Sequence, residues 1–234
     1  MLHGFERTAT TEPKFIRLSK ALADLGIPSL RVDFAGIGLS EGDYKNTTVE
    51  SMTSDLIVVI DDLKSRYGFE KISIVAHSLG ACVVANLLNK NRNDLHKFVL
   101  IAPALNQRDL MRYWFTVNQL SKTNPEIKVD WNNFKNYLDE AAFLKDSLHK
   151  KITKAHVVGA EYFLENRAND YLNNFLGYED KVLFVQGTKD DKVPIESLNV
   201  NLPNKILVEN ADHDIEKPGL WEEWTKQAAE FFKI

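Results

Sequence analysis

The sequence has little of what defines several large classes of protein. Cys82 is the single cysteine among 234 residues, so an internal disulfide framework is excluded and a reducing compartment is expected. No apolar run approaches the roughly 18 residues that a membrane-spanning helix needs. Disulfide scaffolds and membrane-spanning proteins are therefore excluded, as are collagen-like and coiled-coil chains.

The sequence also lacks an excess of positive charge. Lys and Arg together number 29 against 33 Asp and Glu, which gives a formal net charge of −4. A sequence-independent nucleic-acid binder needs a basic face to displace phosphate counterions, so we expect no nucleic-acid partner. Residues 1–5 have neither the basic start nor the apolar stretch of a secretory signal, and we predict a cytoplasmic location.

The pattern that is present is an alternation of short β-branched runs with amphipathic stretches. This alternation is typical of a parallel sheet flanked by helices, an α/β fold in one domain. The predicted strands are residues 29–33, 72–76, 98–101, 182–185 and 206–208. The predicted helices are residues 13–25, a helix between a Thr47–Glu50 capping box and Gly68, residues 79–89 and a last helix from Leu220 onwards.

A long segment interrupts the alternation. Residues 105–178 hold 12 of the chain's 24 aromatic residues, in mostly helical sequence rich in Asn and Lys. We predict that residues 1–104 and 179–234 form the core and that residues 105–178 form a helical lid (cap) insertion. Its aromatic side chains either pack a small core of their own or line a substrate pocket.

The strongest local signal is the run Ala76-His77-Ser78-Leu79-Gly80, which stands between a predicted strand and a predicted helix. A sharp turn in this context, a nucleophile elbow, exposes a serine hydroxyl at the carboxyl end of a sheet. Small residues on both sides of the turn let neighbouring backbone pass close by. Ala76 is one methyl group larger than the glycine usual at the first of these positions. The context makes Ser78 the candidate nucleophile, with His77 as a packing or hydrogen-bonding neighbour.

A serine hydroxyl needs a base to remove its proton, and the base needs an orienting acid. His213 lies in a polar loop after the last predicted strand, and Asp190 and Asp191 both follow the preceding strand. The order Ser78, then an aspartate, then His213 is the chain order of α/β-hydrolases. Two backbone N–H groups must also face the developing oxyanion, and the candidates are those of Leu79 and Phe5.

The chain resembles α/β-hydrolases, and among them serine esterases of the cinnamoyl/feruloyl-esterase type. The resemblance covers residues 3–104 and 181–234 and leaves the insertion unmatched. It rests on His3-Gly4-Phe5, on the Gly-rich run of residues 31–42, on the elbow at Ser78, and on Gly187-x-x-Asp190-x-x-Val193-Pro194. The family's acid maps onto Asp190 by this last spacing, so the resemblance favours Asp190 over Asp191.

One departure from the family pattern concerns the start of the chain. In the family the His-Gly pair follows a central strand, whereas here only Met1 and Leu2 precede it. A missing central strand leaves unpaired backbone groups on both neighbours, each costing about 1–3 kcal/mol if buried. We therefore expect that the sequence lacks its natural N-terminal strands; direct pairing of the strand after Gly26 with the serine strand would contradict this.

Together these patterns predict a serine hydrolase that cleaves a carboxylic ester through an acyl-enzyme. The expected partner is a small-molecule ester with an apolar acyl or aryl part, and the predicted chemistry needs no metal and no organic cofactor. Three alternatives keep the fold: a monoacylglycerol lipase, thioesterase or peptidase with the same triad, a non-catalytic binding protein, or an acyltransferase. The sequence carries no indication of an oligomeric state.

Overall fold

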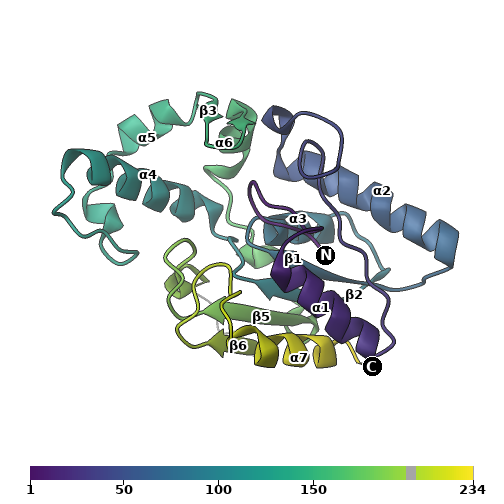
Figure 1. The fold of residues 1–234 in the computed structure, drawn as a ribbon. Helices are drawn as coiled ribbons and strands as arrows, with labels where there is room; N and C mark the ends of the chain where they lie inside the picture. The colour runs from purple at the N-terminus through teal and green to yellow at the C-terminus, as the bar shows by residue number, and fades with distance from the viewer. Residues whose placement is uncertain (199–203, 234) are drawn as a thin grey trace.

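The protein is described by a computed structural model in which residues 1–198 and 204–233 are placed (Figure 1). Its main sheet is parallel and has the strand order β1-β2-β5-β6. These strands are β1 (Ile72–His77), β2 (Leu95–Ile101), β5 (Val182–Gly187) and β6 (Lys205–Val208). All four were predicted from the sequence, with ends that differ by a few residues. The carboxyl ends of the strands consequently meet at one edge of the sheet.

Helices cover both faces of this sheet. The α-helices of the core are α1 (Pro13–Asp24), α2 (Val49–Tyr67), α3 (Gly80–Leu88) and α7 (Trp221–Phe231). Helices α1 and α7 pack together on one face, and α2 and α3 pack together on the other. Successive strand residues alternate between the two faces, as Val99 and Leu100 do in β2. Strands β1, β2 and β5 are buried on both sides along most of their length, which is why their sequences are continuous apolar runs, whereas Leu207 in the edge strand β6 is 42% exposed.

The N-terminal residues lie at the β1 side of the sheet. Leu2 forms single parallel bridges to Val32 on one side and to Ala76 of β1 on the other. The amide of Leu2 donates to the carbonyl of Val75 at 2.8 Å, and the amide of Val32 donates to the carbonyl of Met1 at 3.1 Å. The prediction of a strand over residues 29–33 was wrong, because the segment pairs only at Val32. Nor does Val32 pair with β1 directly, since Leu2 lies between them.

Helix α2 begins one residue later than the capping box predicted. Its N-cap is Thr48, whose hydroxyl accepts from the Ser51 amide while the Ser51 hydroxyl accepts from the Thr48 amide, both at 3.0 Å. The predicted Thr47–Glu50 box was wrong because the carboxylate of Glu50 instead binds Asn86 and Lys90 at the end of α3. Gly68 ends the helix in the left-handed conformation, with φ of 70°, as its position predicted.

Most of residues 105–178 lie above the carboxyl ends of the strands (Figure 1), whereas Phe175 near the end of the segment packs against Phe98 of β2. The segment contains α4 (Gln107–Thr123), α5 (Glu140–Asp146), α6 (Ala160–Asn166) and a short hairpin of β3 (Lys151–Ile152) and β4 (Val157–Val158). The 3₁₀ turns of the chain are η1 (Tyr44–Asn46), η2 (Phe134–Asn136), η3 (Leu172–Phe175), η4 (Glu179–Lys181) and η5 (Ile195–Leu198). The sequence did not indicate the hairpin, because two-residue strands are too short to show alternation. No helix in the described ranges is both long and apolar enough to cross a bilayer.

The insertion is fastened to the core on two sides. From α6, the Glu165 carboxylate accepts from the amides of Val49 and Glu50 at 2.6 and 2.9 Å, and thereby caps the N-terminus of α2. From α4, the Trp114 indole N–H donates to the carbonyl of Lys192 at 2.7 Å. Desolvation raises the pKa of Glu165. The insertion is thus held against the loops that surround the carboxyl edge of the sheet.

Candidate active site

Ser78 stands at the turn between β1 and α3 with a backbone φ of 52°. This left-handed conformation is unfavourable for a residue with a side chain, and the surrounding contacts hold it. The Ser78 amide donates to the carbonyl of Ile101 at 2.9 Å, and its carbonyl accepts from Ala104 at 3.2 Å. A Cβ on Gly80 would lie 2.8 Å from the carbonyl oxygen of His3, so the second small position of the elbow is required here. The result is a serine held in a strained turn at the carboxyl edge of the sheet.

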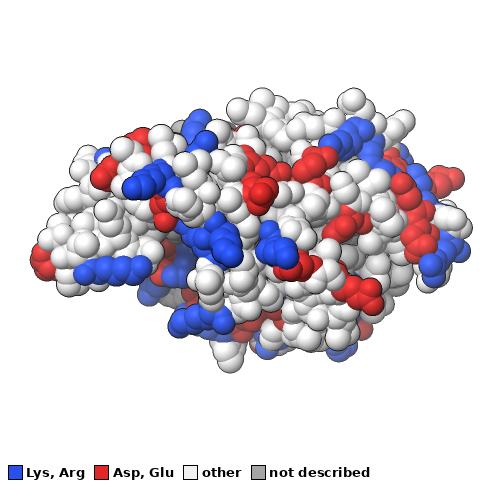
Figure 2. All heavy atoms as spheres, turned by 90° about the horizontal axis from the view of Figure 1, so that it is seen from above, with Lys and Arg blue, Asp and Glu red and all other residues white. Residues whose placement is uncertain are grey.

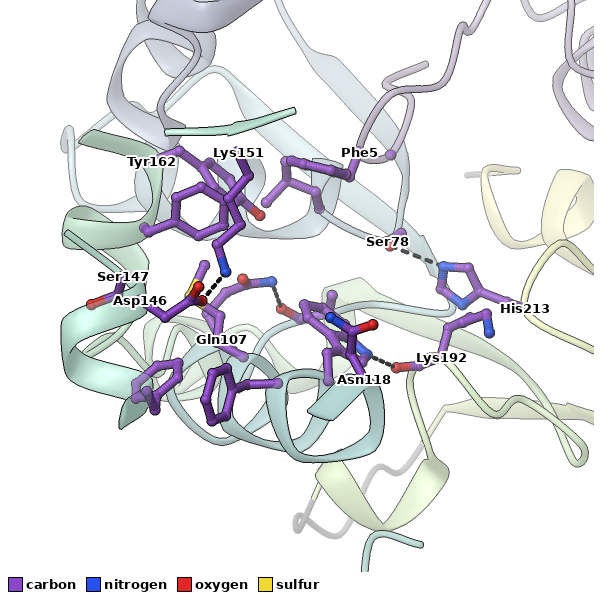
Figure 3. A pocket seen from close by; sticks show the side chains of 18 of the residues that line it. Phe5, Ser78, Gln107, Asn118, Asp146, Ser147, Lys151, Tyr162, Lys192 and His213 are labelled. Atoms are coloured by element: carbon purple, nitrogen blue, oxygen red, sulfur yellow. Dashed lines mark hydrogen bonds and ion pairs between the residues drawn. The ribbon is translucent and has the colours of Figure 1, made fainter. Parts of the chain in front are cut away.

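The structure brings His213 and Asp190 to this serine. His213 Nε2 lies 3.0 Å from Ser78 Oγ (Figure 3). On the other side of the ring, His213 Nδ1 lies 2.8 Å from Asp190 Oδ2. Gly187, at the end of β5, makes the approach of the histidine loop possible. A Cβ on Gly187 would lie 2.4 Å from the carbonyl oxygen of Ala211. Three segments remote in sequence therefore meet at one edge of the sheet.

Of the two adjacent aspartates, only Asp190 faces His213. Its side chain is fully buried. Its Oδ1 accepts from the amides of Lys192 and Val193 at 2.9 and 2.8 Å, and its Oδ2 also accepts from Gln186 Nε2 at 2.9 Å. Asp191 points to solvent, where its carboxylate pairs with the ammonium of Lys192. Three hydrogen bonds thus fix the Asp190 carboxylate so that its Oδ2 faces Nδ1 of the imidazole.

The two candidate oxyanion donors flank the serine. Neither the Phe5 nor the Leu79 N–H donates to another group in the described part of the chain. The loop that carries Phe5 is fixed by His3, whose Nε2 accepts from the Phe34 amide at 3.0 Å and whose Nδ1 lies 2.7 Å from the carbonyl oxygen of Gly4. Desolvation lowers the pKa of His3, which favours the neutral ring that this acceptor role needs.

His77 packs directly behind His213. The ring centroids are 4.8 Å apart, and Nε2 of His77 donates to the backbone carbonyl of His213 at 3.1 Å. His77 is 1% exposed, and burial together with the nearby Lys14 ammonium holds its pKa well below the ordinary value. His77 is thus a neutral hydrogen-bonding neighbour of the histidine loop, as expected from the sequence.

A cluster of ion pairs around the buried ammonium of Lys14 holds the same loop from the other side, and no pattern in the sequence indicates it. Lys14 in α1 is 1% exposed, and its ammonium lies 2.9 Å from both Glu12 and Glu216. The guanidinium of Arg7 contacts both carboxylate oxygens of Asp214 at 2.5 Å. These contacts join the loop after His213 to the loop after Phe5. Hydrophobic periodicity assigns a lysine in an amphipathic helix to the exposed face, so it does not predict that Lys14 is buried.

A cavity of about 760 Å³ opens beside Ser78, between the core and the insertion. Its core side includes Phe5, Leu79 and His213. Its insertion side is lined by Gln107, Met111, Trp114, Phe115, Asn118, Lys122, Phe143, Asp146, Ser147, Lys151, Tyr162 and Phe163. Figure 3 shows Lys151 and Asp146 at the end of the cavity away from Ser78. Both expectations for the aromatic residues are met: Trp131 and Phe134 pack on each other within the insertion, while others line the cavity.

Groups with other possible chemistry lie apart from this site. Cys82 is buried in α3, its thiol donates to the carbonyl of Ala104, and desolvation raises the pKa of that thiol. Within residues 1–198 and 204–233 no three His, Cys, Asp or Glu side chains are grouped as metal ligands would be. Asp33, in the Gly-rich run, accepts from the amides of Ala9 and Thr10 and so ties the Phe5 loop to residues 31–42.

The parallel sheet, its helices on both faces and the serine turn after β1 define an α/β-hydrolase fold. The family model described as serine aminopeptidase S33 (Hydrolase_4) matches residues 1–203. The chain therefore belongs to this family of α/β-hydrolases. Its relatives support the conclusion that the protein is a hydrolase.

Solved structures of the same fold include esterases and a lipase. One match is the Est1E protein of Butyrivibrio proteoclasticus, solved with bound ferulic acid. The matched region covers 98% of this chain and 85% of Est1E, at 20% identity and a TM-score of 0.68. The chain also matches a monoacylglycerol lipase of Paleococcus ferrophilus over 98% and 91% of the two chains, at 20% identity and a TM-score of 0.62. At these identities the likeness concerns the fold.

Sequence relatives match a smaller part. Human ABHD12B protein is 35% identical over 108 residues, which are 45% of this chain and 29% of that protein. The lysophosphatidylserine lipase ABHD12 of Danio rerio is 34% identical over 89 residues, 38% of this chain and 22% of that protein. The matched region thus spans less than a third of either relative.

Proposed function

We propose that the protein is a serine hydrolase that cleaves carboxylic esters through an acyl-enzyme. The observation that carries the proposal is the continuous chain of contacts from Ser78 Oγ to His213 Nε2 at 3.0 Å and from His213 Nδ1 to Asp190 Oδ2 at 2.8 Å. The serine at the end of this series of contacts has a strained backbone conformation and faces a large cavity. Nucleophile, base and orienting acid are the parts that acyl transfer requires.

In the first half of the reaction, Ser78 Oγ attacks the ester carbonyl carbon while its proton passes to His213 Nε2. Asp190 holds the imidazole with its Nδ1–H toward the carboxylate and stabilises the charged ring. The tetrahedral oxyanion accepts hydrogen bonds from the N–H groups of Phe5 and Leu79. Collapse of this intermediate breaks the bond to the alcohol, which leaves with the proton held by His213.

In the second half, His213 takes a proton from water, and the hydroxide attacks the acyl-Ser78 carbonyl. The same two N–H groups hold the second oxyanion, and its collapse releases the acid and returns the proton to Ser78. No step draws on a group beyond the side chains and amides already described.

The lining of the cavity favours an ester with an apolar acyl or aryl part. Side chains of Met111, Phe115, Phe143 and Phe163 form much of the wall on the insertion side. Burial of such a group is worth roughly 0.8 kcal/mol for each CH₂ removed from water. We assign residues 105–178 the role of a lid that completes this pocket. A long-chain monoacyl ester fits the same apolar wall, and lipases stand among the relatives.

Labelling with a fluorophosphonate, followed by peptide mass spectrometry, tests the proposed nucleophile. We expect stoichiometric modification of Ser78 that is lost in Ser78→Ala and strongly slowed in His213→Ala. The matched control is Ser54→Ala, because Ser54 is an exposed serine of α2, away from the cavity. Labelling of a different serine, or undiminished labelling in His213→Ala, would contradict the mechanism.

An ester series with acyl chains of two to sixteen carbons then tests the substrate class. We expect kcat/KM to rise with chain length until the cavity is filled. Turnover of thioesters or of aminoacyl amides in preference to esters would favour the thioesterase or peptidase alternative. Turnover of no ester, with ligand binding that persists in Ser78→Ala, would favour a non-catalytic binding protein.

A further inference from the structure

The tip of the insertion exposes apolar side chains in an unusual density. Within residues 144–157 the side chains of Leu144, Leu148, Ile152 and Val157 are exposed by 40, 52, 79 and 36%. We call these four residues, with Lys145, Lys150 and Lys154 between them, the tip patch. Isolated apolar residues on a surface need no explanation, but a concentration of them marks a surface that binds a partner.

Local geometry places the apolar side chains of the patch in two pairs. Leu144 and Leu148 are four residues apart across the end of α5, the spacing of one helical turn. Ile152 and Val157 are directly paired across the β3–β4 hairpin, so their side chains project from the same face of it. Figure 1 shows α5 and the hairpin at the upper rim of the molecule, on the far side of the insertion from the sheet.

The lysines of the patch are free to meet a partner of opposite charge. Lys145, Lys150 and Lys154 are exposed and form no ion pair within the described ranges, while Lys151 pairs with Asp146. Residues 144–157 contain four lysines and one carboxylate, a net charge of +3 in a chain of net charge −4. In Figure 2, Lys and Arg side chains, together with some Asp and Glu side chains, stand among uncharged surface on the left part of the face.

The patch is continuous with the wall of the cavity. Asp146, Ser147 and Lys151 belong to the same segment and line the cavity that contains Ser78. In the hairpin, Lys151 and its partner Val158 face inward, opposite to Ile152 and Val157. A surface docked on the patch would therefore lie beside the cavity.

We propose that the tip patch docks the protein on an anionic lipid surface. Lysines interleaved with exposed aliphatic side chains fit a bilayer interface, because the ammonium groups meet anionic headgroups while the apolar side chains enter the acyl boundary. An acidic protein surface would also pair with the lysines, but that alternative predicts no binding to anionic vesicles that contain no protein. Docking uses no part of the catalytic chemistry and is expected to persist in Ser78→Ala.

Sedimentation with vesicles tests the proposal on the full chain. We expect binding to vesicles of phosphatidylcholine with 30% phosphatidylglycerol, weaker binding to phosphatidylcholine alone, and release at high salt. Lys150→Gln with Lys154→Gln is expected to lower the partition coefficient about 25-fold, since each lysine near an anionic surface contributes about fivefold. Ile152→Ser with Leu148→Ser is expected to abolish measurable binding.

Matched controls lie elsewhere on the surface. Val58→Ser removes an aliphatic side chain that is 69% exposed on α2, and Lys226→Gln removes an exposed lysine of α7. Both controls should bind as the wild type does, and all variants should hydrolyse a water-soluble short ester equally. No sedimentation with anionic vesicles, equal binding to both vesicles, or equal losses in patch and control variants would overturn the proposal. Because soluble-ester turnover is measured separately, these outcomes leave the proposed function to its own tests.

Discussion

His77 is expected to make folding stability fall as the solution becomes acidic. In the folded chain its ring is buried behind His213, next to the Lys14 ammonium, and its pKa lies well below the ordinary value. In the unfolded chain a histidine has a pKa of about 6.5. Below that pH the unfolded state takes up a proton that the folded state does not, so His77 lowers the free energy of unfolding as the pH falls.

The size of the effect follows from the unfolded state alone. If the His77 ring stays neutral in the folded chain, lowering the pH from 7 to 5 costs about 1.9 kcal/mol of stability. That is a large share of the 5–15 kcal/mol that holds a typical domain together. His77→Gln retains an N–H that reaches the His213 carbonyl and removes the titration.

Urea unfolding of the wild type and of His77→Gln at pH 7 and pH 5 measures this cost. We expect the wild type to lose about 1.9 kcal/mol more than the variant between the two pH values. His149→Gln serves as the control, because His149 is exposed and its removal should leave the pH dependence as it is. Equal losses in wild type and His77→Gln would refute the assignment of a neutral buried ring.

Four further substitutions test the geometry of the site and the ion pairs of Asp94. Gly187→Ala should lower kcat at least about tenfold with the fold intact by circular dichroism, because its Cβ would lie 2.4 Å from the Ala211 carbonyl oxygen in the loop that carries His213. Asp190→Asn should lower kcat about 10⁴-fold by losing the correct tautomer, whereas Asp191→Asn should stay within about twofold in the same ester assay. Asp94→Asn should flatten the loss of stability between pH 5 and pH 3, measured by urea unfolding. The Arg92 and Lys64 side chains hold the pKa of Asp94 below its usual range, so its contribution is present above about pH 4 and is lost as the pH falls further.

Much of the core was predictable because the spacing of apolar residues along the sequence indicates which side chains are buried. Residues of β1, β2 and β5 alternate between two buried faces, which is the arrangement that their continuous apolar runs predict. The elbow at Ser78 and the loop at His213 follow from their places after strands. Asp190 was favoured over Asp191 by spacing, and the structure shows the physical difference, since only Asp190 is buried and met by backbone amides.

The remaining features depend on contacts between distant segments. The segment of residues 29–33 has strand composition but pairs only at Val32, because its neighbour in the sheet is the short segment at Leu2. Helix α2 begins one residue later than predicted because the carboxylate of Glu50 binds Asn86 and Lys90 and does not form the predicted capping box. Gln186, which braces Asp190, and Lys14, which braces the histidine loop, carry no local signal of their roles. Such roles belong to the packed chain and not to any window of sequence.

The place of the insertion has a consequence for the order in which the molecule is completed. Strand β2 pairs with β5 through Phe98 and Val182. The sheet can therefore form completely only after the whole segment between these strands has been synthesised and has brought β5 beside β2. Ser78 precedes His213 by 135 residues. A nascent chain that has emerged as far as the insertion holds the proposed nucleophile without its base and is chemically silent. The time at which fluorophosphonate labelling begins during refolding would therefore report when the loop of His213 reaches Ser78.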